Sequence, residues 1–395
     1  MTQEPKIFPY IARLLQGAEV VWKPLGEVAE LKRGTTITKK TSNEGIYPVI
    51  SGGQQPAYYI DQFNRDGETI TVAGSGAYAG FVMYWNEPIF VGDAFSVKAD
   101  EKQVLPRFIY HFLLSIQEKI HDLKSGGGVP HVYAKDVARF VIPLPPLSVQ
   151  QEIVRILDKF TQLEAELEAE LDCRKRQYEY YRNKLLTFNE IGGGTEIVWK
   201  TLGEVGEVTK LAGFEFTNYV KYNDIGKIIA LRGLNVKGSL DLSDVKYIDE
   251  SDFSKLNRSK LYINDMLFTY VGTVGSVALI PENDKYYLAP NVARIRFLDR
   301  RINPRFMFHY FQSDEFEKKQ INRYLGSSSM KNLTMENIRK FQIPLPPLEE
   351  QQRIATILDK FDTLVNSISE GLPKEIALRR KQYEYYRERL LSFPS

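Results

Sequence analysis

The longest regular pattern in the chain lies at 148–188, where apolar residues recur every three or four positions among Glu, Lys, Arg and Gln. This stretch has no Pro or Gly, so it predicts one long helix whose single apolar stripe a second helix should cover. The stretch 349–392 repeats the pattern and is the expected partner, although Gly371 and Pro373 should kink or interrupt it. The residues expected to pack in this helix pair are Ile153, Leu157, Phe160, Leu163, Leu167, Leu171, Tyr178, Tyr181, Ile354, Leu358, Phe361, Tyr383 and Tyr386.

The segments that precede the two helices predict mixed α/β structure. Short runs rich in β-branched and aromatic residues, separated by Gly, Asn and Asp turns, are typical of strands. These runs are 47–50, 68–73, 81–85, 228–232, 266–271 and 293–297. Each segment also contains one aromatic-rich stretch opened by Pro, at 106–120 and at 304–319, which predicts a helix with core-facing aromatic side chains.

The chain is internally duplicated, because three segments occur twice. The pairs are VWKPLGEVAE (21–30) with VWKTLGEVGE (198–207), FVIPLPPLSVQQEIVRILDKF (140–160) with FQIPLPPLEEQQRIATILDKF (341–361), and RKRQYEYYRNKLLTF (174–188) with RRKQYEYYRERLLSF (379–393). The middle segments, 31–139 and 208–340, have little in common beyond a glycine-rich turn. A duplication that keeps the ends alike and the middles different predicts one architecture that presents two different surfaces.

Connectivity predicts how the two copies are arranged. A helix of some forty residues is roughly 60 Å long, so the domains on either side of it should lie at its opposite ends. The second helix must then run back, which gives an antiparallel pair with approximate two-fold symmetry and brings the termini close together. The predicted boundaries are 1–146 for the first domain, 147–190 for the first helix, 191–347 for the second domain and 348–395 for the second helix, broken near 371–373.

Composition restricts the class of protein. Cys173 is the only cysteine, which excludes an intrachain disulfide and a thiolate-rich metal cluster. No stretch reaches the roughly 18 to 20 apolar residues of a membrane helix, and the first ten residues do not resemble a signal peptide, so we expect a cytoplasmic protein without membrane contact. The net charge of +2 gives only a weak indication of nucleic-acid binding.

Motifs for chemistry are missing from the sequence. There is no GxxxxGK[ST] phosphate loop, and NEPIF at 86–90 lacks the second Pro of an adenine methyltransferase motif. The four histidines are scattered, which favours structural or surface positions over metal ligation. We therefore expect no metal site, no cofactor in this chain and no catalysis. A coiled-coil interaction scaffold whose globular domains bind protein or carbohydrate is the alternative to a nucleic-acid reader.

The duplicated PLGEV, IPLPPL…QQ.I..ILDKF and QYEYYR.(K/R)LL(T/S)F segments resemble the specificity subunits of type I restriction-modification systems, over essentially the whole chain. The tandem EAEL at 164–167 and 168–171 resembles a tetrapeptide array whose length sets target spacing in one subgroup of that family. The resemblance implies an α/β fold class: two mixed α/β target-recognition domains separated by two long antiparallel helices in a coiled-coil-like pair, with an internal pseudo-two-fold repeat.

The resemblance also implies a function and partners. Each target-recognition domain would read one half of a bipartite site in double-stranded DNA, and the paired helices would set the spacing and dock two modification (methyltransferase) subunits. Restriction subunits with endonuclease and translocase activity would join that complex. S-adenosylmethionine, ATP and Mg²⁺ are then expected on the partner subunits.

Loops that carry hydrogen-bonding side chains are the places where we expect contacts with DNA. In the first domain the candidates are Lys32, Arg33, Lys39, Lys40, Gln54, Gln55, Ser75, Tyr78, Lys124 and His131. In the second domain they are Arg232, Asn235, Thr273, Ser276, Asn291, Arg294, Ser328 and Lys331. Structural turns are the alternative interpretation of these loops.

Overall fold

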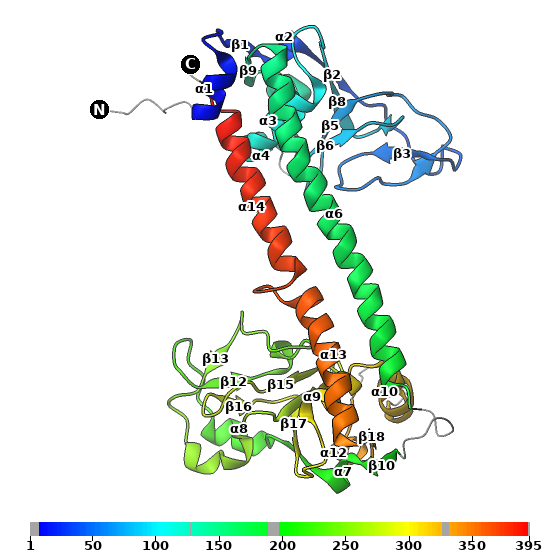
Figure 1. Cartoon of the computed structure of the whole chain (residues 1–395), viewed down its shortest axis with the longest axis vertical. Coiled ribbons are helices and arrows are strands. Elements are labelled where there is room, and N and C mark those ends of the chain that lie inside the picture. The colour runs from blue at the N-terminus through cyan, green and yellow to red at the C-terminus, as the bar shows by residue number, and fades with distance from the viewer. Residues whose placement is uncertain (1–7, 127, 189–196, 326–331, 394–395) are drawn as a thin grey trace. The chain divides into compact units, whose positions relative to one another are not determined.

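A computed structural model describes residues 8–126, 128–188, 197–325 and 332–393 (Figure 1). The chain divides into two compact units: unit 1 comprises Met1–Ala169 and Lys374–Ser395, and unit 2 comprises Glu170–Pro373. Each unit contains one globular domain and parts of two long helices. The mixed α/β class, the internal repeat and the helix pairing predicted from the sequence are confirmed.

Unit 1 is built from nine strands and seven helices or helix segments among its described residues. The strands are β1 (Val21–Pro24), β2 (Ala29–Arg33), β3 (Tyr47–Ile50), β4 (Tyr59–Ile60), β5 (Thr69–Ala73), β6 (Val82–Trp85), β7 (Phe90–Val91), β8 (Ala94–Ala99) and β9 (Val141–Leu144). The helices are α1 (Pro9–Leu15), α2 (Leu25–Val28), α3 (Pro106–Ser115), α4 (Gln117–His121), α5 (Ala134–Val137), the first part of α6 (Leu147–Leu186), and α14 (Leu372–Leu390).

Unit 2 repeats this order with more short elements. Its strands are β10 (Val198–Thr201), β11 (Gly206–Lys210), β12 (Ile229–Leu231), β13 (Lys246–Tyr247), β14 (Met266–Thr269), β15 (Val277–Leu279), β16 (Tyr286–Leu288), β17 (Val292–Phe297) and β18 (Gln342–Leu345). Its helices are the end of α6, α7 (Leu202–Val205), α8 (Gly213–Tyr219), α9 (Pro304–Tyr310), α10 (Asp314–Phe316), α11 (Asn322–Tyr324), α12 (Met335–Arg339), α13 (Leu348–Asn366), the 3-10 turns η1 (Gly233–Asn235), η2 (Phe253–Lys255) and η3 (Asn257–Ser259), and the π-helical η4 (Glu317–Ile321).

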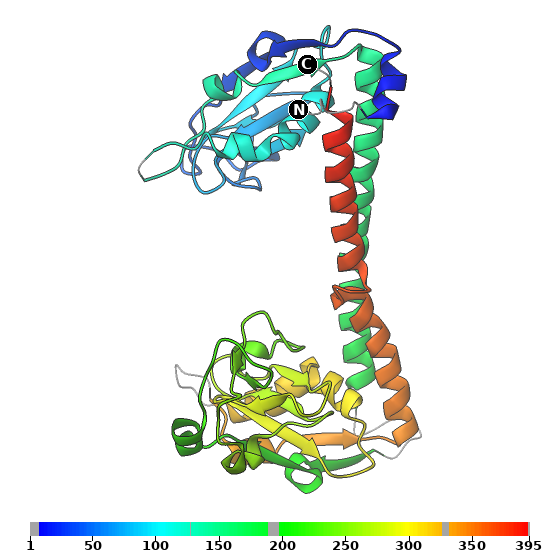
Figure 2. The same cartoon turned by 90° about the vertical axis from the view of Figure 1, so that its left-hand side faces the viewer.

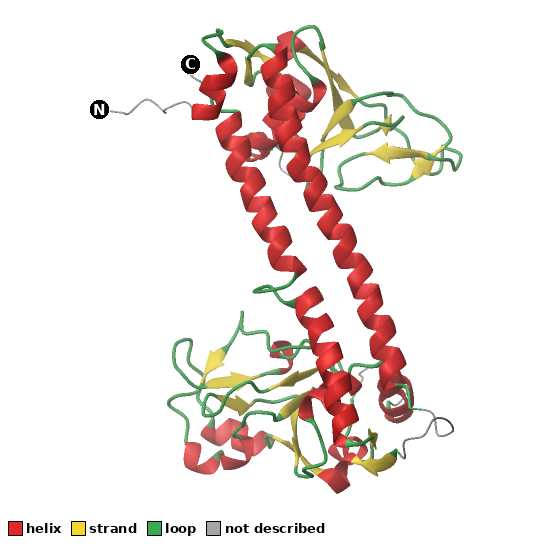
Figure 3. Cartoon of the chain, viewed as in Figure 1, coloured by secondary structure: helices red, strands yellow, loops and turns green. Residues whose placement is uncertain are grey.

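Both units combine strands with helices (Figure 3), and their sheets have the same strand order. Unit 1 has a four-stranded sheet of order β2-β8-β5-β6 and a three-stranded sheet of order β4-β3-β7, and unit 2 has β11-β17-β14-β15 and β13-β12-β16. In each unit the repeated segments also form a two-stranded antiparallel ribbon, with Trp22 opposite Pro143 and Trp199 opposite Pro344. A proline, which has no N–H to donate, is tolerated there because each ribbon strand has only one neighbour and so needs hydrogen bonds on one edge only.

The long helices start and stop where the sequence allows. Helix α6 begins directly after Pro145 and Pro146 and runs without interruption through forty residues. The second helical stretch is broken between Asn366 and Leu372, where α13 ends and α14 begins. Gly371 packs so closely that a Cβ atom there would lie 2.3 Å from the Thr363 carbonyl oxygen, and Pro373 then occupies the first turn of α14.

Within unit 1, α6 and α14 lie side by side in both views of the chain (Figures 1 and 2). The Phe160 ring stacks on Tyr386 with centroids 5.3 Å apart, and Arg380 pairs with Glu164 and Glu168 at 2.5 Å each. Higher residue numbers on α6 meet lower ones on α14, so the two helices are antiparallel. The two glutamates come from successive copies of the EAEL tetrapeptide, which therefore fastens α6 to α14 in this unit.

The main core of each unit includes residues from both long helices. In unit 1, Ile153 and Leu157 of α6 pack in one cluster with Leu390 of α14 and the domain interior. In unit 2, Leu358 of α13 shares a cluster with Leu186 of α6. The domains are therefore joined to the helices by continuous apolar packing, which stabilises in proportion to the buried area.

The two Pro-opened aromatic stretches are helical, but neither is a single helix. The first is broken at Ile116, between α3 and α4. The second is broken after Tyr310, because the Ser313 hydroxyl caps a new helix start by accepting a hydrogen bond from the Phe316 N–H at 3.2 Å. Their aromatic side chains face the core as predicted, with Phe108 and Phe306 fully buried.

Candidate nucleic-acid interface

In unit 1, two loops and the end of β2 meet at Asp93, which lies between β7 and β8. Its carboxylate accepts a hydrogen bond from the Ser75 hydroxyl in the β5–β6 loop and forms an ion pair with Arg33, with 3.4 Å between Nη2 and Oδ1. Asp93 was not among the sequence candidates, since an aspartate after a short strand gives no signal of its own. It holds two of those candidates, Ser75 and Arg33, at one place on the domain.

A fourth segment, 124–133, crosses the same loop. The Gly76 N–H donates to the Pro130 carbonyl at 3.0 Å, and the Lys124 ammonium donates to the Ala77 carbonyl at 3.2 Å. The His131 imidazole is within hydrogen-bonding distance of the Val129 carbonyl, 2.7 Å away. Lys124 and His131 therefore shape this surface by binding backbone groups of the loops.

The tip of the β5–β6 loop projects from this cluster. Gly76 and Gly80 have φ values of +85° and +86°, which lets the loop turn sharply where other residues would be strained. The turn leaves Tyr78 48 % exposed. A large amphipathic side chain held on a rigid tip suits contact with a macromolecule.

The remaining candidates of unit 1 lie around this cluster. Gln54 and Gln55 are exposed on a loop that touches the cluster, because a Cβ atom on Gly52 would lie 2.3 Å from the Ser75 carbonyl oxygen. The exposed side chains of Lys32, Lys39 and Lys40 are supplied by β2 and the segment that follows it.

In unit 2, three candidates line one cavity of about 470 Å³: Arg232, Thr273 and Asn291. The cavity also has an apolar wall that includes Phe216, Tyr222 and Leu234, none of which were predicted as site residues. We call this cavity the aromatic pocket. Aromatic residues outside the periodic segments, such as Phe216 and Tyr222, are a weak sequence signal for such a wall, but their approach to Asn291 depends on the fold.

Two candidates of unit 2 are buried and serve the domain itself. Asn235 is 0 % exposed, and its amide accepts from the Arg232 N–H and donates to the carbonyls of Asp241 and Asp244. Arg294 is 4 % exposed in the central strand β17, where its guanidinium pairs with Glu207 at 3.2 Å. These side chains stabilise their own surroundings and do not reach the surface, so the interpretation of both as direct DNA contacts is corrected here.

The last three candidates of unit 2 divide between described and undescribed residues. Ser276 follows the glycine-rich turn and lines, with Thr273, a second cavity of about 400 Å³ that also includes Arg182 of α6. Ser328 and Lys331 lie outside the described residues.

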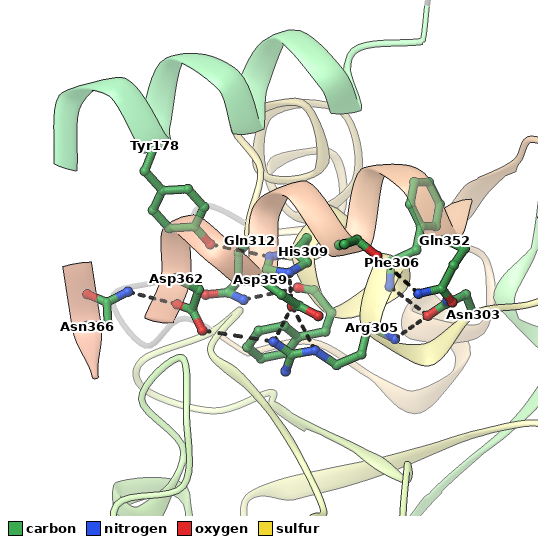
Figure 4. Close-up of polar contacts among 12 residues, drawn as sticks. Tyr178, Asn303, Arg305, Phe306, His309, Gln312, Gln352, Asp359, Asp362 and Asn366 are labelled. Carbon is green, nitrogen blue, oxygen red and sulfur yellow. Dashed lines mark hydrogen bonds and ion pairs between the residues drawn. The ribbon is translucent and has the colours of Figure 1, made fainter. Parts of the chain in front are cut away.

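Each domain is fastened to the long helices by the same polar network, which we call the docking network. In unit 2, the Arg305 guanidinium forms two hydrogen bonds to Asp359 of α13, and the His309 Nε2 lies 2.7 Å from the same carboxylate (Figure 4). The His309 Nδ1 lies 3.3 Å from the hydroxyl of Tyr178, which is on α6. One domain helix, α9, therefore contacts both long helices through a single buried histidine.

Unit 1 contains the matching set. The Arg107 guanidinium and the His111 Nε2 meet Asp158 of α6, the latter at 2.7 Å, and the His111 Nδ1 lies 2.9 Å from the Tyr383 hydroxyl of α14. The interpretation of His111 as a structural histidine agrees with this position. Sequence reasoning missed the network as a whole, although its members lie in the duplicated segments or in the paired PRF…H helices.

Burial and charge fix the protonation of the docking network. Burial lowers the pKa of His111 and of His309, so both rings are neutral near pH 7. Burial also opposes the charge of Asp158, but hydrogen bonds from His111 and Arg107 outweigh it and lower the pKa of that carboxyl. Because a carboxylate only accepts hydrogen bonds, His111 must donate through Nε2 to Asp158 and accept a hydrogen bond at Nδ1 from the Tyr383 hydroxyl.

One buried glutamine completes each attachment. The Gln150 side chain accepts from the Leu105 N–H at 3.0 Å and donates to the Pro145 carbonyl at 2.9 Å. Gln351 accepts from the Asn303 N–H at 2.9 Å and donates to the Pro346 carbonyl at 2.8 Å. Both glutamines are fully buried, so each duplicated QQ segment supplies one residue that ties the helix start to the domain.

Other duplicated residues face outward and are not explained by packing. On each long helix, two basic residues flank a tyrosine at spacings of four, which places all three on one helix face. These basic-aromatic stripes are Arg176, Tyr180 and Lys184 on α6, and Lys381, Tyr385 and Arg389 on α14. Tyr180 is 58 % exposed and Tyr385 is 48 % exposed.

Among the described residues there is no group of three or more His, Cys, Asp and Glu side chains placed to hold a metal ion. In the same part of the chain, no helix is both long enough and apolar enough to span a bilayer. The candidate surfaces described above carry hydrogen-bonding, basic and aromatic side chains, a set suited to contacts with nucleic acid.

Comparisons with known proteins agree with this architecture. The family model for the type I restriction modification DNA specificity domain matches residues 18–172 and 196–378. The type I restriction enzyme EcoR124I/EcoR124II specificity subunit of Escherichia coli is 31 % identical over 98 % of this chain and 97 % of its own length. A crystal structure of a type I restriction-modification system S subunit from M. genitalium shares the fold, with a TM-score of 0.63 and 16 % identity over 100 % of this chain and 99 % of that one.

Proposed function

Because the chain belongs to the family of type I restriction-modification specificity subunits, we propose that it recognises a split DNA sequence, with one domain for each half. The observation that carries this proposal is the contrast between identical attachments and different loops. The docking network is built twice from the same residue types, whereas the loops around Asp93 in unit 1 differ from the aromatic pocket in unit 2. Two equivalent attachments that carry different surfaces suit a protein that recognises two different short DNA sequences.

The chain acts through binding alone in this proposal. Sequence is read by hydrogen bonds and apolar contacts to base edges, and the exposed loop residues of both units offer these groups. Partner subunits would carry out DNA methylation and cleavage, and they would hold S-adenosylmethionine, ATP and Mg²⁺. The cytoplasm is the proposed location, since the target is chromosomal or entering DNA.

The basic-aromatic stripes support docking of two identical modification subunits. Tyr180 and Tyr385 lie on the two long helices, and each ring has a cation from the next turn over it, Lys184 or Arg389. The side chains of both stripes are exposed, and both copies of the repeat have them. One partner that binds twice would meet the same surface on each copy, and a restriction subunit would then join through that partner.

The helices would also set the distance between the half-sites. One further EAEL tetrapeptide after Leu171 adds about one helical turn, roughly 5 to 6 Å, and should lengthen the unread spacer by about one to two base pairs. Mapping of methylated sites in cells that carry the insertion tests this. An unchanged spacer would contradict the role of the helices in spacing.

The proposal is tested by purifying the chain together with the modification subunit encoded beside it and by selecting bound fragments from mixed genomic DNA at moderate salt. We expect enrichment of one motif with two short specified parts and an unspecified spacer. Salt must be controlled, because phosphate contacts alone give binding without sequence preference at low ionic strength. Retention without any sequence preference would overturn the proposed function.

A further inference from the structure

The aromatic pocket of unit 2 combines one free amide with an apolar wall. Asn291 is exposed at the pocket, and its side chain makes no hydrogen bond to any other described residue. Phe216 contacts Tyr222, with ring centroids 5.6 Å apart, and Leu234 is 43 % exposed beside them. A hydrogen-bonding group next to uncovered apolar side chains indicates a ligand that is polar on one side and apolar on the other.

The backbone holds Asn291 rigidly at this position. Its φ of +70° lies in the left-handed region, which asparagine tolerates better than most residues. The next residue, Val292, is fully buried and begins β17, a strand paired on both sides by β11 and β14. The Asn291 amide is therefore held at the end of a central strand of the main sheet and not on a long loop.

The charged side chain of the pocket is less suited to reading a ligand. The Arg232 guanidinium is held by Asp244, through its carboxylate at 2.9 Å and its carbonyl at 2.8 Å. With its charge neutralised by Asp244, this arginine is a poor anchor for a phosphate. Among the described lining residues, the pocket thus offers neutral hydrogen bonding and apolar contact rather than an anion site.

One base pair has matching chemistry. In the major groove, adenine presents the N7 acceptor and the N6 donor, which an asparagine side chain binds with two hydrogen bonds, and the paired thymine presents a methyl group that packs on apolar side chains. We propose that the aromatic pocket reads one A·T base pair of the half-site assigned to unit 2, with Asn291 on the adenine edge and Phe216 in the wall that receives the thymine methyl. This inference rests on the proposed function.

The test uses the complex with the modification subunit and duplexes that carry its selected target. At each A·T pair of both half-sites in turn, 7-deaza-adenine removes the N7 acceptor and deoxyuridine removes the thymine methyl. At one pair we expect each analogue alone to weaken binding several-fold, and both together to approach about 10- to 100-fold, the range of a good bidentate contact. No sensitive A·T pair in either half-site would overturn the inference.

Two variants assign the contacts to residues. Asn291→Gly removes the amide and keeps the left-handed backbone, because glycine adopts positive φ without strain. This variant should lose its response to 7-deaza-adenine at that pair while keeping its response at every other position. Phe216→Leu keeps an apolar side chain and should reduce only the response to deoxyuridine. Asn291→Asp should shift the preference at that position towards cytosine, whose N4 amino group donates to a carboxylate.

Each outcome has a distinct meaning. If Asn291→Gly folds with an unchanged unfolding midpoint and retains the full A·T preference at every position, the inference is wrong while the proposed function stands. Uniform weakening on all sequences would assign Asn291 to backbone contact, and loss of the modification subunit would assign the pocket to a protein partner; both results overturn it. Absence of any split target for the wild type would instead refute the proposed function.

Discussion

In unit 1, Arg107 and His111 meet Asp158, and in unit 2, Arg305 and His309 meet Asp359 with the same atoms and the same 2.7 Å approach of Nε2. The tyrosine that completes each network comes from the other long helix: Tyr383 for unit 1 and Tyr178 for unit 2. Duplication has thus kept the attachment of a domain to its helices, although the attached domains have diverged.

The divergence is concentrated in the smaller sheet of each unit. In unit 1 the residues around β3, β4 and β7 form two clusters of only four and three buried apolar residues. The corresponding cluster around β12, β13 and β16 in unit 2 has sixteen, and it supports the added turns beside the aromatic pocket. The constant part of each unit is therefore a support, and the variable part carries the surface that we assign to DNA.

The largest effect is expected from breaking one docking network. Asp158→Asn leaves the partly buried Arg107 charge without a counterion, which should lower the free energy of unfolding by roughly 2 to 4 kcal/mol, somewhat below the cost for a fully buried pair because the carboxylate is 37 % exposed. Asp359→Asn should cost somewhat less, because Arg305 keeps a second ion-pair partner in Asp362, 4.0 Å away. Chemical unfolding of both variants measures this, with Asp172→Asn, which removes an exposed ion pair, as the control. A larger loss for Asp359→Asn than for Asp158→Asn, or no loss for either, would contradict this account.

The next effect concerns the basic-aromatic stripes. Tyr180→Ala and Tyr385→Ala should each remove one modification subunit from the complex at limiting concentration, and the double variant should remove both, since an aromatic anchor contributes about 1 to 3 kcal/mol to an interface. Mass measurement of the purified complex gives the stoichiometry. Leu378→Ala is the matched control, because Leu378 is 45 % exposed on the same helix but its repeat counterpart is Cys173. Normal stoichiometry in the double variant would contradict the stripe as a docking surface.

A smaller effect is expected from acid. The pKa of His111 and of His309 is lowered by burial, so the folded state binds these protons less readily than the unfolded chain. Their contribution is complete above the unfolded pKa of about 6.5 and is lost as the pH falls from there through the folded value, at up to about 1.4 kcal/mol per pH unit for each histidine. We expect a total loss of about 1 to 2 kcal/mol between pH 7 and pH 5.5.

The histidines can be separated from the carboxylates in this experiment. Gln at position 111 or 309 keeps an N–H donor for the aspartate and does not titrate, so the His111→Gln, His309→Gln double variant should show a flatter pH profile in that window. Asp158 and Asp359 have lowered pKa values and contribute only at more acidic pH. An unchanged slope in the double variant would exclude the two histidines as the source.

The smallest effect distinguishes the two ends of the helix pair. Arg380→Ala removes the pairing with Glu164 and Glu168 in unit 1, and because these side chains are exposed the loss should be below about 1 kcal/mol and should shrink in high salt. The repeat counterpart, Lys175, has no ion pair among the described residues, so Lys175→Ala should be neutral. Equal effects of both variants would show that the EAEL glutamates do not stabilise unit 1 specifically.

Local patterns were enough to predict the long helices, six of the strands and the repeat. The 148–188 stretch predicted α6 because its apolar spacing is uninterrupted, and Gly371 and Pro373 indicated the interruption between α13 and α14. The predicted strands at 47–50 and 266–271 correspond to β3 and β14. These features depend on residues that are close together in the sequence, so they can be predicted from it.

The sites were harder to predict because they depend on distant residues. His111 and Tyr383 are separated by 272 positions, so no local signal joins them. Asn235 and Arg294 have polar side chains of the kind that contact DNA, but both are buried and bind groups of their own domain. Asn291 was correctly placed on an exposed turn, whereas the wall formed by Phe216 and Tyr222 required the fold.

Methylation mapping in cells that express the complete complex tests the central claim most directly, namely that each unit reads its own half of one target. The wild type is compared with Tyr78→Ala in unit 1 and Asn291→Gly in unit 2. We predict a target of two short parts, in which the first variant relaxes one part only and the second variant relaxes only the other. A continuous target, or a change in both parts from either variant, would contradict the account.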